Sequence, residues 1–230
     1  MASAENAIYA LDPVHTRVQF AISHAGFSQA LGTVSGSTGT LLFDPNDWSS
    51  ARIEVSVPIT RLDLGDATWN TSALASNLLD GRDHPVATFA STRVEPIDAQ
   101  HATVHGTLTL RGVAQDTALA VTFNQLKRHP LPPFRRTAGF SATTAISRKA
   151  FGISAWPRVI GDRVELRIEA EATRATAGAA MPDSSDTQHS TTPTDPQPTQ
   201  GALSVPQAQT RSEAAPPATP LSEPTDEPTR

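Results

Sequence analysis

The segment from Arg163 to Glu171 reads RVELRIEAE, and it decides the fold class. Val164, Leu166 and Ile168 alternate with charged residues at every second position. Successive side chains of a β-strand point to opposite faces, so this period of two predicts a strand with one buried and one solvated face. The segment therefore indicates a sheet whose apolar face is covered.

The same alternation recurs through most of the chain. It is present at 17–23, 53–59, 104–110 and 119–123, and further strands are expected at 33–44, 86–95 and 138–148. Turn-forming residues separate the strands, such as DPN at 44–46, EPID at 95–98 and GD at 161–162. About eight long strands with one apolar face each predict an all-β domain, and the length of the strands favours a barrel over a sandwich.

One short helix is expected between the strands. Thr71 or Ser72 is expected to cap its N-terminus, the apolar residues within 74–79 to form its buried face, and Gly81 to end it. A single amphipathic helix in this place is expected to cover one end of the barrel.

Composition changes sharply after residue 174. Ten of the nineteen prolines lie within 175–230, whereas every Phe, Trp and Tyr lies before that segment. A segment so poor in apolar residues cannot offset the entropy of ordering, so we expect 175–230 to be a disordered, acidic tail rich in Pro, Ser and Thr. Residues 1–7 are assigned to an N-terminal segment and 8–174 to the barrel domain.

Charge and residue types narrow the function classes. Residues 1–174 carry 16 basic and 16 acidic side chains, so binding to nucleic acid is not expected. The absence of cysteine excludes disulfides, thiolate ligands and cysteine nucleophiles. His101 and His105 are four residues apart, but on a strand this spacing separates them by roughly 13 Å, too far for one ion. No metal site is expected.

The sequence contains no convincing catalytic set. The segments 26–29 and 139–142 both lack the last glycine of the nucleophile elbow of hydrolases. Asp12, His15 and Ser23 can be combined on paper into a triad, but almost any chain with seven histidines allows such a combination. We therefore expect no enzymatic activity.

The apolar stripes of the strands supply the interior of the expected barrel. An eight-stranded barrel is close to the size at which side chains either fill the interior or leave space for one small ligand. The residues alone leave a filled core and a ligand-binding pore both open. The candidate pore-lining residues are Phe20, Ile22, Phe89, Leu108, Leu110, Phe123, Phe140 and Ile146.

Several short motifs, in order from about residue 8 to 172, resemble the YceI-like family. They are YALDPxHT (9–16), VxFxIxHxGF (18–27), GxLxFDP (39–45), HPxAxF (84–89), GxLTLxGV (106–113), GFSATTxIxRxxFGI (139–153) and GDxV (161–164). Each motif is modest, but their common order over nearly the whole expected domain makes the resemblance specific. One departure is the uncharged stretch 69–74, where many relatives carry charged residues, so a head-group contact there does not carry over.

The resemblance implies an extended, antiparallel, lipocalin-like barrel of about eight strands with one helix and a long apolar pore. Members of the family bind isoprenoid chains, such as polyprenyl phosphates or the tails of ubiquinone-type quinones. We therefore expect a carrier of an isoprenoid lipid or a ubiquinone-type quinone, without a covalent cofactor. The alternative is a filled barrel that docks a membrane redox partner such as a cytochrome b561-type protein, because some relatives are encoded beside or fused to one.

The resemblance also implies a periplasmic location, because most members of the family are exported. Ala2-Ser3-Ala4 fits the end of a signal peptide that lies upstream, and it fits an ordinary small-residue N-terminus equally well. A homodimer is left open.

Overall fold

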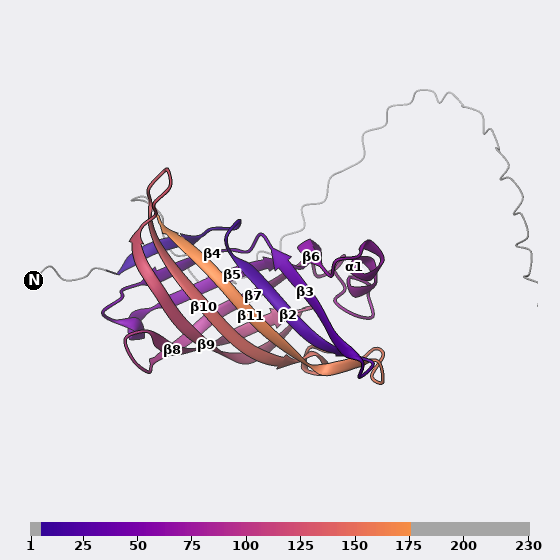
Figure 1. The fold of residues 1–230 in the computed structure, drawn as a ribbon. Helices are drawn as coiled ribbons and strands as arrows, with labels where there is room; N and C mark the ends of the chain where they lie inside the picture. Colours follow the sequence, from indigo (N-terminus) through magenta and orange to yellow (C-terminus); the bar gives the residue numbers. More distant parts are fainter. Residues whose placement is uncertain (1–5, 176–230) are drawn as a thin grey trace, which may run out of the picture. The chain divides into compact units, whose positions relative to one another are not determined.

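The computed structural model describes residues 6–175, which form an antiparallel β-barrel (Figure 1). The strands are β1 (Ala7–Leu11), β2 (Arg17–His24), β3 (Ser28–Ser35), β4 (Thr38–Phe43), β5 (Arg52–Pro58), β6 (Leu62–Asp63), β7 (Val86–Pro96), β8 (His101–Leu110), β9 (Val113–Arg128), β10 (Arg136–Ser147) and β11 (Ile160–Arg174). The described helices are α1 (Ala67–Ala73) and three 3₁₀ turns, η1 (Trp48–Ser50), η2 (Ile59–Arg61) and η3 (Arg148–Phe151).

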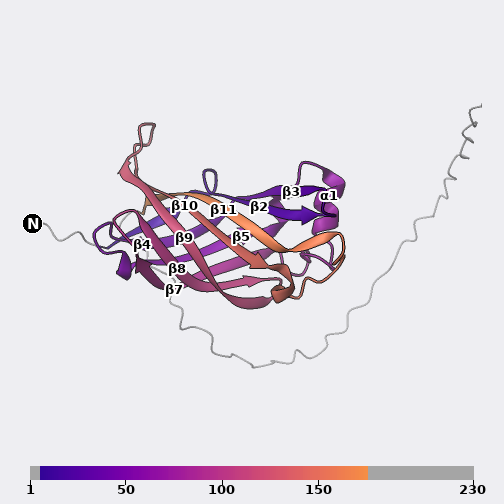
Figure 2. The same ribbon diagram turned by 60° about the horizontal axis from the view of Figure 1, so that its bottom comes forward.

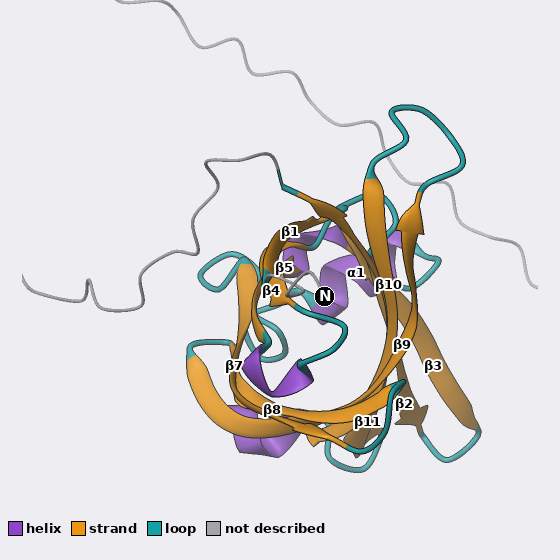
Figure 3. Ribbon diagram, turned by 90° about the vertical axis from the view of Figure 1, so that its left-hand side faces the viewer, coloured by secondary structure: helices purple, strands orange, loops and turns teal. Residues whose placement is uncertain are grey.

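Eight of the strands close a ring in the order β1-β4-β5-β7-β8-β9-β10-β11, and β1 pairs with β11 to complete it. The ring is visible in Figure 3, which looks along the barrel. This closed antiparallel barrel confirms the fold class predicted from the alternation. With 16 residues at about 3.3 Å each, β9 is roughly 50 Å long, so the barrel is elongated.

The strand β11 pairs with two strands of the N-terminal region, β1 and β2. Its last residues pair with β1, from Ala172 to Arg174, and its earlier residues pair with β2, up to Glu169. The sheet then continues from β2 to β3 and to the short β6. Along one edge of β11, the barrel is therefore continued by β1 and β4 at the C-terminal end of the strand. At its N-terminal end, the same edge is continued by β2, β3 and β6.

Two expectations about the strands are wrong in detail, and one strand of the ring was not expected. The expected strand 33–44 is two strands, because Gly36 takes a left-handed φ of +81° and breaks the chain between β3 and β4. The expected turn at 161–162 lies inside β11, where the pairing with β2 shifts register between Ile160 and Val164. The strand β1 was not predicted, since its five residues are too few to show a clear period.

The expected helix lies between the right strands, but its expected start and its expected end at Gly81 are both wrong, because α1 spans Ala67–Ala73. The carboxylate of Asp66 accepts a hydrogen bond from the backbone N–H of Trp69 at 2.9 Å and caps α1. Thr71 and Ser72 lie inside α1, where their hydroxyls donate to carbonyls one turn earlier. The apolar residues within 74–79 follow α1 in a series of turns.

The described strands lie within the range 8–174 that was expected for the barrel domain, except that β1 begins one residue earlier, at Ala7. The expected disordered tail, apart from Ala175, and the Ala2-Ser3-Ala4 segment lie outside the described residues.

Candidate functional site: an apolar cavity inside the barrel

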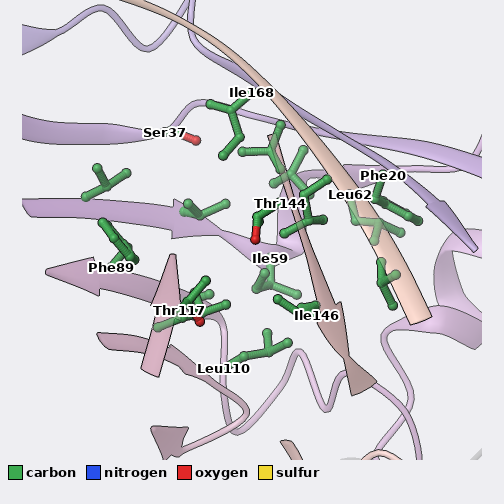
Figure 4. A pocket seen from close by; sticks show the side chains of 18 of the residues that line it. Phe20, Ser37, Ile59, Leu62, Phe89, Leu110, Thr117, Thr144, Ile146 and Ile168 are labelled. Atoms are coloured by element: carbon green, nitrogen blue, oxygen red, sulfur yellow. The ribbon is translucent and has the colours of Figure 1, made fainter. Parts of the chain in front are cut away.

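The interior of the barrel is a cavity of about 730 Å³, lined almost entirely by apolar side chains (Figure 4). This volume is within the range of roughly 300–1,000 Å³ that is typical of small-molecule sites. Many inward-facing residues, such as Phe20, Ile22 and Ile146, are only partly buried, because they border the cavity and not other side chains. The interior is therefore not a filled core.

Seven of the eight candidate pore-lining residues border the cavity. These are Phe20, Ile22, Phe89, Leu108, Leu110, Phe140 and Ile146. The placement of Phe123 in the pore is wrong. Its ring packs against the rings of Phe43, Trp48 and Phe140, with centroids 5.3, 5.8 and 5.5 Å away.

This aromatic cluster closes one end of the barrel. Phe43 and Trp48 are buried and meet edge to face, with centroids 5.4 Å apart. Edge-to-face pairs add stabilisation beyond the area they bury. Buried Tyr9 belongs to the same core, so this end is sealed by large side chains. We call it the closed end.

Two glycines of the cavity wall leave space for neighbouring phenylalanine rings. A Cβ atom at Gly32 would clash with the ring of Phe20, which lies opposite it on the neighbouring strand. A Cβ atom at Gly106 would clash with the ring of Phe89 in the same way. Each ring thus lies against the barrel wall over a glycine and projects less into the interior. This arrangement leaves space that two phenylalanines would otherwise fill.

The other end of the barrel carries the opening, which we call the mouth. Trp69, Trp156 and Val159 border the cavity and are also exposed to solvent, and we call these three residues the lip. They come from α1 and from the loop between η3 and β11, which lie at the same end of the molecule in Figures 1 and 2. Exposed Ser72 and Asn77 also line the cavity near α1.

Polar groups at the mouth are few. The ring of His24 lies against Trp69, with centroids 5.4 Å apart and an interplanar angle of 44°. With Ser72 and Asn77, His24 gives the mouth a small set of hydrogen-bonding groups. Such a set can contact the head group of a ligand whose chain lies in the barrel. The amino-acid sequence carries no clear signal for this set of polar groups, because the residues lie on separate elements.

Two buried polar atoms of the lining have no hydrogen-bond partner among the described residues. They are Oγ of Ser37, in the wall between β3 and β4, and Nε1 of Trp48 at the closed end. Buried polar atoms in proteins are nearly always hydrogen-bonded. A ligand atom or a water in the cavity would satisfy them.

The histidines do not form a metal site within residues 6–175. His101 and His105 each pair with a separate carboxylate, of Asp98 and Glu95 respectively. His15 is paired with Asp12, with Nδ1 and Oδ2 2.8 Å apart, at the turn before β2. Ser23 lies near the other end of that strand, so the three residues of the paper triad are not brought together.

The fold and the site together define a closed antiparallel barrel with an elongated apolar cavity that opens at one end. Residues 9–172 match the model of the YceI-like domain, and the chain belongs to this family. A UPF0312 protein of Ectopseudomonas mendocina is 31% identical over 168 residues, which cover 72% of this chain and 87% of the relative. A UPF0312 protein of Shewanella baltica is 28% identical, covering 75% of this chain and 90% of the relative.

Solved structures share the fold. BcnA of Burkholderia cenocepacia has a TM-score of 0.64 at 23% identity, covering 71% of this chain and 99% of that protein. A YceI protein of Campylobacter jejuni has a TM-score of 0.60 at 23% identity, covering 65% and 88%. A domain of Saccharophagus degradans, described as polyisoprenoid-binding, has a TM-score of 0.51 at 17% identity, covering 74% and 100%. Within residues 6–175, no helix has the length and apolar character needed to cross a bilayer.

Proposed function

We propose that this protein binds a long isoprenoid lipid, a polyprenyl chain or a ubiquinone-type quinone, with its tail inside the barrel. The observation that carries the proposal is the elongated apolar cavity of about 730 Å³ with one sealed end and one open end. The description of the Saccharophagus degradans domain as polyisoprenoid-binding supports it. The family resemblance points to the same ligand class.

The affinity would come from burial of the tail. Each Å² of apolar surface removed from water contributes about 25 cal/mol, before the costs of ordering and association. A long chain threaded toward Trp48 would gain this along its whole length, and the sealed end would limit the length that fits. The head group would lie at the mouth, near His24 and Asn77.

The titratable groups of the lining favour carriage over catalysis. Among the described lining residues they are His24, Arg52 and Arg148, without a carboxylate. Arg52 donates to the carbonyls of Ser49 and Ala51, and Arg148 donates to three carbonyls of its own chain segment. Groups that are engaged in this way are poor candidates for moving protons on a ligand.

A periplasmic location, a cytochrome b561-type partner and a homodimer remain predictions. The cavity argues against the filled-barrel form of the alternative, but not against docking to a membrane partner. Fractionation of the native host tests the location, and recovery of the protein only in the cytosol would contradict it.

Native mass spectrometry of the purified protein tests the proposed function. Delipidated protein would be offered ubiquinone and polyprenols of graded tail length, and palmitate as a control lipid. We expect one isoprenoid molecule per chain, retained in preference to palmitate. Equal retention of palmitate would indicate a general lipid site, and retention of no lipid would contradict the proposal.

A further inference from the structure

The mouth carries an exposed apolar surface that the binding of a tail inside the barrel does not explain. Trp156 is 60% exposed and Trp69 is 46% exposed, although both border the cavity. Phe27, on the turn between β2 and β3, is 92% exposed and does not line the cavity. Clusters of exposed large apolar side chains mark surfaces that meet a partner or a membrane.

Contacts between the elements bring these side chains to one end of the barrel. The backbone N–H of Ala25, two residues before Phe27, donates to the carbonyl of Val159. The backbone N–H of Val159 donates to the carbonyl of Trp156 at 2.9 Å. The ring contact of His24 with Trp69 joins α1 to the end of β2. The β2–β3 turn, α1 and the loop before β11 therefore form one surface around the opening, and Figure 2 shows them together at one end.

We propose that this surface, formed by Phe27 and the lip, docks on a lipid bilayer. Tryptophan suits the bilayer interface, because its ring is apolar while its indole N–H can donate to head groups. The opening of the cavity would then face the membrane, so that a tail could pass between bilayer and barrel without crossing water. The inference rests on the proposed function, since a water-insoluble cargo is what makes such a passage useful.

The charged side chains near the opening are few, so charge is expected to contribute little to binding of a lipid surface. Arg158 is exposed between two residues of the lip and makes no ion pair or side-chain hydrogen bond with the described residues, so it can contact a lipid phosphate. The nearby carboxylates of Asp66 and Asp162 are held by hydrogen bonds within the protein. Apolar insertion, which salt does not screen, would therefore provide most of the binding.

The chain offers a matched control at the closed end. Phe134, in the loop between β9 and β10, is 50% exposed, and Figure 1 shows this loop at the end of the barrel opposite α1. Phe27→Ser and Phe134→Ser remove the same apolar group from opposite ends. Neither residue lines the cavity, so both variants should retain isoprenoid as the wild type does.

Co-sedimentation of the full chain with vesicles of phosphatidylethanolamine and phosphatidylglycerol tests the proposal. We expect Phe27→Ser to weaken vesicle binding by about tenfold or more, the effect of losing one inserted aromatic side chain. Phe134→Ser should bind as the wild type does, and high salt should leave most of the binding intact.

The failures of the two proposals are distinguishable. Equal vesicle binding by the two variants, or no binding by the wild type, would overturn the docking surface even if isoprenoid is retained. Vesicle binding that depends on Phe27, without retention of any isoprenoid, would contradict the proposed function and leave the docking surface in place. A loss in Phe27→Ser that requires a membrane protein in the vesicles would assign the surface to that protein and overturn docking on lipid.

Discussion

The guanidinium of Arg148 donates from Nη2 to the backbone carbonyl of Ile160, 2.9 Å away. The same group donates from Nε to the carbonyl of Gly161 at 2.8 Å and from Nη1 to that of Ile153 at 3.0 Å. Arg148 is only 4% exposed, and this burial lowers the pKa of its guanidinium, while the charge of Asp162 opposes the shift. One buried side chain thus holds both ends of the loop that carries part of the lip.

Replacement of Arg148 by Gln should lower the free energy of unfolding by about 2–4 kcal/mol, because buried carbonyls lose their donors. Arg148→Lys keeps the charge but makes fewer of the three hydrogen bonds. Its free energy of unfolding should therefore lie between those of the wild type and Arg148→Gln. The midpoint of urea unfolding measures both variants. A midpoint for Arg148→Gln equal to that of the wild type would show that the loop is held by other contacts.

The glycines under the two phenylalanine rings should be sensitive to added volume. Gly32→Ala would push against side chains alone, those of Phe20 and Leu64, whereas Gly106→Ala would also meet the backbone carbonyl of Ala90. Overpacking of this kind typically costs about 1–3 kcal/mol. We expect Gly106→Ala to be the less stable variant in thermal unfolding. The reverse order would show that the strand carrying Gly106 shifts more easily than the Phe20 ring.

The pairing of Asp12 with His15 predicts that the free energy of unfolding depends weakly on pH. Burial tends to raise the pKa of Asp12, but hydrogen bonds from His15 and from two backbone N–H groups outweigh it and lower this pKa. The hydrogen bond and the charge of Asp12 raise the pKa of His15. The contribution of His15 to the free energy of unfolding is present below its unfolded pKa, about 6.5, and is lost as pH rises through its higher folded pKa. That of Asp12 is present above its unfolded pKa, about 3.9, and is lost as pH falls through its lower folded pKa.

Titration of the His15 ring by NMR measures this coupling directly. In Asp12→Asn the pKa of His15 should return toward its ordinary value. Since the His15 side chain is largely exposed, the pair should stabilise the protein by no more than about 0.5 kcal/mol. An unchanged His15 pKa in the variant would mean that another group, such as Glu171, sets it.

The alternation of apolar and polar residues was sufficient to predict the barrel, but it could not predict where along the barrel axis an inward-facing residue lies. In β9, Leu119, Val121 and Phe123 were all expected to face inward; the first two line the cavity, whereas Phe123 packs into the closed end. The distinction depends on where the η1 segment folds over the barrel, and this is a contact between distant parts of the chain. A period of two carries no information about it.

The residue pattern alone could not decide between a filled core and an open interior, for a similar reason. Phe20 and Phe89 fit either a core or a pore, and only the pairing of β2 with β3 and of β7 with β8 places them over Gly32 and Gly106. The start of α1 was missed because Asp66, Thr71 and Ser72 are all residue types that cap helices, and residue type alone does not decide among them. The lip was missed because Trp156 and Val159 belong to a loop, which has no periodicity, and because α1, which carries Trp69, is only seven residues long.

The central claim is that the interior holds a lipid tail, and the most direct test is the longest tail retained when the deep cavity is narrowed. Ala170 lines the cavity on β11 opposite Phe140, near the closed end, whereas Ala120 on β9 faces outward. Mass spectrometry would profile retained isoprenoids by tail length for Ala170→Phe, with Ala120→Phe as the control. We predict that Ala170→Phe shortens the longest retained tail, while Ala120→Phe leaves the profile unchanged. An unchanged profile in folded Ala170→Phe would contradict binding of the tail inside the barrel.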